Sequence, residues 1–138
     1  MTTPPVLPDV DELVTSALRA GLPDGVAVRV LWPADWVDVL PLVVARRVGG
    51  TAIDPIGLDA ATVDVQAAAT TRRAASTLAR TARVVLLGAC RVQWRGRDGY
   101  LSHGEDVSGP FELRTGEPVA GPDFFRFQAT YRVTARPS

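Results

Sequence analysis

The residue types that most often carry chemistry are sparse in this sequence, and they form no known catalytic pattern. His103, the sole histidine, lies beside Ser102, Glu105 and Asp106, which together hold the residue types of a Ser-His-acid triad. Triad members meet across a fold rather than as neighbours in a glycine-rich segment, so we interpret these residues as a solvated turn. A single histidine with no cysteine near it supplies too few ligands for a zinc site. Gly49-Gly50 has neither the dinucleotide-binding spacing nor the lysine of a phosphate-binding loop.

Two other groups of reactive side chains have simpler structural explanations. Asp9, Asp11 and Glu12 are acids of the kind used in hydrolysis or metal binding, but they open an amphipathic segment, where carboxylates complement the dipole of a first helical turn. Cys90, the only cysteine, has no histidine near it in sequence and is more typical of a small core residue than of a nucleophile. The sequence therefore predicts no enzyme, no catalytic residue, no cofactor and no metal site.

Arginine is the residue type with the strongest remaining binding chemistry. The 15 basic residues apart from His103 are all arginine, and 15 acidic residues give a formal net charge of zero. This balance argues against a protein whose main task is to grip nucleic acid, although it leaves room for a local basic stripe. The best such stripe is one face of a predicted helix, with Arg72, Arg73, Arg80 and Arg83. A charged face is a solvated surface in most helices, and no aromatic residue interleaves these arginines to stack on bases.

Four aromatic residues lie in or beside segments predicted to be irregular. Trp32 and Trp36 share one proline-containing segment, and Phe111 and Phe124 belong to or border a Gly/Pro-rich one. Aromatic residues in loops either fold back on the core or anchor protein interfaces, and the sequence leaves both readings open. Arginine is also enriched at interfaces. We take as candidate interface residues Trp32, Trp36, Arg72, Arg73, Arg80, Arg83, Phe111 and Phe124.

Two helices are predicted. Residues 9–20 have Asp9 as N-cap and Glu12 three residues later in a capping-box-like pair, and Gly21 and Pro23 end the segment. Residues 71–89 predict a second helix, capped by Thr70 or Thr71 and about 30 Å long at 1.5 Å per residue. Its apolar stripe is Ala75, Leu78, Ala79, Ala82, Val85, Leu86 and Ala89.

Strands are predicted from apolar runs and alternation at residues 26–31, 42–48, 61–69 and 125–134. Residues 32–40 and 49–60 are predicted loops. Asp98-Gly99 predicts a hairpin turn between 91–95 and 99–103. Residues 104–122 are either a long loop or a splayed hairpin with Phe111 and Leu113 on one arm.

This order of elements predicts an α+β two-layer sandwich. A mixed or antiparallel sheet of about four to five strands, with both helices on one face, buries every apolar stripe. The length fits one domain, which we assign to residues 9–138, after a flexible leader at residues 1–8 that contains three prolines. No stretch approaches 18 apolar residues and no signal peptide is evident, so we expect a soluble protein made in a cytoplasm, without a membrane partner.

Longer stretches of the sequence carry a resemblance. The chain opens with PDVDELVTSALRA and passes through PLVVARRVGG to ATVDVQAAATTRRAASTLARTARVVLLGA, where VDVQ joins a strand to the long helix. It ends in the strand FFRFQATYRVTARP. From about Pro8 to Pro137, this arrangement resembles the tail terminator, or tail completion, proteins of long-tailed phages (siphoviruses).

The resemblance implies a structural virion protein rather than an enzyme. Such a subunit forms a homohexameric ring that caps the head-proximal end of the tail tube, ends tube polymerisation and provides the head–tail joining surface. The implied partners are other copies of the chain, the tail tube protein and a neck or head-completion protein, with genomic DNA passing through the lumen without sequence recognition. The implied location is the tail and neck of the virion, after assembly in the host cytoplasm. The alternatives are another neck or tail component (a head-tail connector or a tail tube subunit) and, less consistent with the charge balance, a nucleic-acid-binding α+β module.

Overall fold

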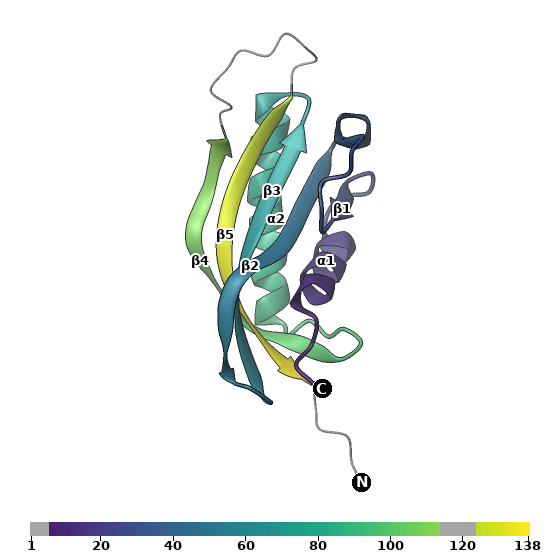
Figure 1. Cartoon of the computed structure of the whole chain (residues 1–138). Coiled ribbons are helices and arrows are strands. Elements are labelled where there is room, and N and C mark those ends of the chain that lie inside the picture. Colours follow the sequence, from purple (N-terminus) through teal and green to yellow (C-terminus); the bar gives the residue numbers. More distant parts are fainter. Residues whose placement is uncertain (1–5, 114–123) are drawn as a thin grey trace.

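A computed structural model describes residues 6–113 and 124–138, which form a layer of two helices against a five-stranded sheet (Figure 1). The elements are α1 (Val10–Gly21), β1 (Ala27–Arg29), the 3-10 helix η1 (Trp36–Val39), β2 (Leu42–Asp54), β3 (Leu58–Ala69), α2 (Arg72–Arg91), β4 (Gly99–Leu113) and β5 (Phe125–Pro137). The strand order is β1-β2-β3-β5-β4, with β1 parallel to β2 and the other pairs antiparallel. The predicted α+β two-layer sandwich with a mixed sheet is confirmed.

Both helices begin at side-chain caps. Asp9 accepts a hydrogen bond from the Glu12 N–H at 3.3 Å, and Thr71, rather than Thr70, accepts one from the Ala74 N–H at 3.1 Å. These bonds satisfy amide groups that have no partner inside the first turn. α2 runs two residues past its predicted end, through Arg91, and the backbone then turns left-handed at Gln93 (φ 57°).

The two helices cover the same face of the sheet (Figure 1). Six of the seven residues of the predicted α2 stripe are buried, and Val85 is partly buried. They share one core with α1 and with the inward residues of β5, which are Phe127, Ala129, Tyr131 and Val133. The prediction that each element buries one apolar stripe against a common layer is confirmed, and this burial is the main source of stability.

The predicted loop at 49–60 is wrong. β2 and β3 pair from Leu42↔Ala68 to Asp54↔Leu58, which leaves only residues 55–57 as a turn. The glycines that suggested a loop instead accompany a bulge, because the register shifts between Arg47 and Gly49. Gly50 has φ +95°, and a Cβ there would collide with the carbonyl oxygen of Ala60, so glycine allows β2 to continue.

The predicted loop at 104–122 is also wrong as far as Leu113, because β4 is a long edge strand. Edge strands tolerate glycine and proline, since one side of the strand has no partner whose ladder bonds would be lost. The hairpin alternative is the better one, because β4 pairs with β5 and carries Phe111 and Leu113 on one arm. Residues 114–122 of this prediction lie outside the described residues, as do residues 1–5 of the predicted leader.

Two smaller predictions also need correction. The hairpin between 91–95 and 99–103 reduces to the single bridge Arg95↔Tyr100, because α2 continues through Arg91. The strand predicted at 26–31 covers only Ala27–Arg29, and the following loop contains η1.

Candidate protein interface

The face of the sheet opposite the helices, here called the open face, is polar along much of its length. β3 presents Asp64 and Gln66 on this face, and β5 presents Gln128. Asp64 accepts hydrogen bonds from Gln66 Nε2 at 3.1 Å and from Gln128 Nε2 at 2.6 Å. The bond from Gln128 joins β5 to β3, whereas the bond from Gln66 lies within β3, and together they hold these side chains in place on the open face.

One end of the open face carries an aromatic cluster, defined as Trp32, Trp36, Phe124 and Arg126. The ring centroids of Trp32 and Trp36 are 5.2 Å apart, those of Trp36 and Phe124 are 4.5 Å apart, and both contacts are edge-on. The guanidinium carbon of Arg126 lies 5.6 Å from the Trp32 centroid and 6.0 Å from that of Trp36. Edge-to-face and cation–π contacts stabilise such a group beyond simple burial. The structure thus brings together three of the predicted interface residues from two distant segments.

The aromatic cluster lies where the open face is locally apolar. Leu42, Val44 and Ala68 are buried but lie outside the core beneath the helices. Residues 30–32 line a small hollow with Val44 and neighbouring polar residues of the open face, so the segment between β1 and β2 lies across it. Both tryptophans are half-buried. They therefore cover a second small apolar cluster, and the exposed part of each ring stays a candidate contact surface.

Phe111 extends this surface toward the sheet edge. It pairs in register with Gln128, and Leu113 pairs with Arg126 of the aromatic cluster. The neighbouring Glu112 points the other way and forms an ion pair with Arg72 on α2. Phe111 thus lies on the open face, 47% exposed.

The four predicted arginines lie in the helix layer, apart from the aromatic cluster. Arg72 pairs with Glu112, and Arg83 donates two hydrogen bonds to Asp106 at 3.0 and 2.5 Å. The hydrogen bond to Asp106, and then its charge, raise the pKa of Arg83. Because carboxylates of β4 pair with two of the four arginines, this face of α2 is less basic than the sequence suggested. Arg73 and Arg80 form no ion pair with any described residue.

Sequence reasoning missed two sets of surface residues. Arg126 lies on the polar side of the terminal strand, and its signal was its place between aromatic residues. At the opposite end of β2 and β3, the hairpin carries the exposed aliphatic residues Val48, Ile53 and Ile56, here called the aliphatic tip. Single exposed aliphatic residues are ordinary, but three on one hairpin are typical of a contact surface.

The residues considered for catalysis are engaged elsewhere. Ser102 Oγ donates to the carbonyl oxygen of Thr134 at 3.2 Å, and Asp106 is bound to Arg83. Burial raises the pKa of the Cys90 thiol to about 11, which removes the reactive thiolate at neutral pH. In the described part of the chain no group of three or more His, Cys, Asp or Glu side chains could hold a metal ion.

Comparison with known proteins identifies the family. A search of curated proteins finds no match. None of the helices in the described ranges is long and apolar enough to cross a membrane. The family model of phage tail termination proteins matches residues 6–138, which is essentially the whole chain. This family is one of structural tail proteins rather than of enzymes. The chain therefore belongs to the phage tail termination protein family.

Proposed function

We propose that this protein forms a hexameric ring that caps the head-proximal end of a phage tail tube. The ring ends tube polymerisation and provides the surface to which the head joins. The observation that carries the proposal is the family match over nearly the whole chain. A ring of this kind needs head-to-tail contacts that close, and two different faces for two different neighbours.

Chemically different surfaces at the two ends of β2 support this role. The β1–β2 connection at one end contributes to the aromatic cluster, and the β2–β3 turn at the other end carries the aliphatic tip (Figure 1). Clusters of Trp and Arg are typical of interface hot spots. One end would contact the tail tube protein and the other a neck or head-completion protein.

Genomic DNA would pass through the lumen of this ring without sequence recognition. The zero net charge and the pairing of Arg72 and Arg83 with β4 carboxylates fit passage better than tight binding. The protein would occupy the tail and neck of the virion after assembly in the host cytoplasm.

Deletion of the gene from the phage tests the proposal. A terminator mutant should make filled heads without tails, together with tail tubes of excessive and variable length in electron micrographs. Tails of normal length that fail to attach would identify a neck connector instead. Complete absence of tails would indicate a tube subunit or an initiator.

A further inference from the structure

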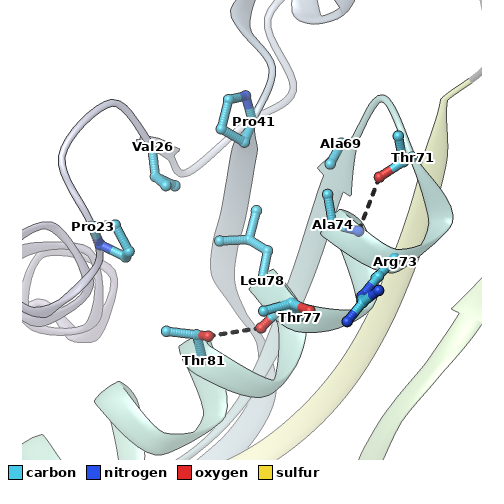
Figure 2. Close-up of a pocket in the computed structure, with 10 residues that line it drawn as sticks. All are labelled: Pro23, Val26, Pro41, Ala69, Thr71, Arg73, Ala74, Thr77, Leu78 and Thr81. Atoms are coloured by element: carbon cyan, nitrogen blue, oxygen red, sulfur yellow. Dashed lines mark hydrogen bonds between the residues drawn. The ribbon is translucent and has the colours of Figure 1, made fainter.

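An apolar groove of about 440 Å³ lies in the helix layer beside α2, and no described residue fills it (Figure 2). Its walls are Leu78 and Ala74 of α2, Pro23 and Val26 on either side of the α1–β1 turn, and Pro41 just before β2. The size is within the range of pockets that bury a small ligand or a protruding side chain.

The groove offers few polar groups to a small polar ligand. The Thr71 hydroxyl accepts the Ala74 N–H, and the Thr81 hydroxyl donates to the Thr77 carbonyl oxygen at 2.7 Å (Figure 2). The Thr77 hydroxyl accepts a hydrogen bond from Arg80 at 3.3 Å. With its hydroxyls engaged, the groove is best matched by an apolar side chain of another polypeptide.

The rim of the groove is basic. Arg73 lines it, and Arg80 lies two turns further along α2; neither forms an ion pair with the described part of the chain. α2 contains five arginines and no acidic residue. Opposite charge across an interface steers and selects the partner, so the occupant should carry carboxylates beside its apolar side chain.

The edge strand β4 of the same chain has this chemistry. Phe111 is 47% exposed and Val107 is 52% exposed, and we call this pair with Glu105 the β4 ridge. From Gly99 to Leu113 the strand carries no arginine or lysine and has three carboxylates, of which Asp106 and Glu112 pair with arginines of α2. Glu105 contacts Arg132 at 3.3 Å with both side chains about half exposed, a weak pair that leaves its charge available to a neighbour.

Groove and ridge lie on opposite sides of the molecule and toward the same end of the sheet. The groove adjoins β1 and the start of β2, whereas β4 is the other outer strand. Along β5, Ala69 of the groove is in register with Phe125, and Phe111 is in register with Gln128. Three residues of strand are about 10 Å. A contact that joins two different sites on successive copies is heterologous. Because the two sites differ little in height along the sheet, successive copies would rise little, which suits closure into a ring rather than growth of a helical filament.

We infer that the groove and the β4 ridge are the two halves of the contact between neighbouring copies of this chain, with Phe111 of one copy seated in the groove of the next. The inference rests on the ring proposed above and assigns its subunit contact.

Cysteine pairs test this contact in tails assembled by a deletion phage that is complemented with the variant gene. In a Cys90→Ala background, Thr77→Cys with Phe111→Cys should give, on mild oxidation, a ladder of covalent multimers that ends in one closed species. The control pair Val92→Cys with Phe111→Cys has an exposed site outside the groove and the aliphatic tip and should give no ladder. Failure of the first pair to link, or dimers from Phe111→Cys alone, would overturn the inference.

Competition for incorporation gives a second test that needs no cysteine. When wild-type and variant genes are expressed together, Phe111→Ser should enter tails roughly tenfold less than wild type, because it loses its anchor in the groove. Val92→Ser, which removes an apolar side chain elsewhere that is even more exposed than Phe111, should enter normally. Equal incorporation of Phe111→Ser would contradict the inference. If even wild-type protein is absent from tails, the proposed function fails, and cross-linking of concentrated purified protein decides the contact separately.

Discussion

At the scale of single residues, arginine side chains connect separate elements of this protein. Arg72 and Arg83 tie α2 to β4, Arg47 ties β2 to β3, and Arg126 lies over two tryptophan rings. A planar guanidinium with several fixed donors suits each of these contacts better than a lysine ammonium would. The abundance of arginine thus supports the fold and the surfaces of the subunit, in agreement with a net charge of zero.

The ion pair between Arg47 and Asp59 should be the most costly to break. Asp59 is 3% exposed and accepts from Arg47 at 2.5 and 2.9 Å, and Asp11 at the start of α1 accepts the Arg47 backbone N–H. We expect Asp59→Asn to lower the free energy of unfolding by about 2–3 kcal/mol, below the range for fully buried pairs because Arg47 keeps contact with water. Glu105→Gln, which breaks an exposed pair, should change it by less than about 0.5 kcal/mol in urea titrations. Equal effects of the two substitutions would contradict this ranking.

Tyr131 and Cys90 should make the fold sensitive to alkali. Burial, and then the charge of Asp106, raise the pKa of Tyr131 from 10 to about 12, and burial raises that of Cys90 from 9 to about 11. The folded state therefore holds these protons more tightly than the unfolded chain. Their contribution to stability is complete below about pH 9 and is lost as the pH rises toward 12.

The double variant Tyr131→Phe, Cys90→Ala tests this pH dependence. The melting temperature of the wild type should fall steeply between pH 9 and 12, and that of the variant should fall less. At neutral pH, Tyr131→Phe should be nearly neutral, because its buried hydroxyl has no hydrogen-bond partner among the described residues. Parallel pH curves for the two proteins would refute the assignment.

At the scale of elements, the sequence predicts those whose pattern is local. The caps Asp9 and Thr71 and the stripe spacing of α2 identify the helices, and strict alternation identifies β3 and β5. The lengths of β2 and β4 depend instead on pairing with strands far along the chain. Glycine in these strands is locally a loop signal, and only the register with the partner strand shows that Gly50 pairs with Ala61 just after a bulge.

The two adjacent glycines of β2 should differ sharply in their tolerance of a side chain. Gly50→Ala would need a left-handed φ and would place Cβ 2.8 Å from Ala61 Cα, so we expect it to cost about 2 kcal/mol or more. Gly49→Ala would meet only Thr62 at 3.8 Å, an ordinary contact, and should cost much less. Chemical denaturation of the two variants measures the difference. Similar midpoints for both would mean that Gly50 does not hold the left-handed backbone beside Ala60 and Ala61.

At the scale of the whole molecule, the candidate interface was predictable in its residue types but not in its grouping. Trp32, Trp36 and Phe124 are conspicuous aromatic residues in irregular segments, yet their meeting depends on β5 lying beside β3. The same strand order separates the arginine face from the aromatic cluster. The groove beside α2 has no sequence signal, because residues from three distant segments form it.

A subunit held between two different neighbours should show two different defects when its two ends are altered. Leu31→Ser with Val37→Ser removes exposed aliphatic side chains from the β1–β2 connection near the aromatic cluster, and Ile53→Ser with Ile56→Ser removes them from the aliphatic tip. These positions are exposed, so both double variants should fold with nearly wild-type melting temperatures. In phage complementation, one variant should give overlong tubes, and the other should give tails of normal length that fail to join heads. Electron microscopy of lysates separates the two outcomes. If both variants gave the same defect, the two ends would serve one partner, and the assignment of separate tube and neck faces to the ends of the sheet would be wrong.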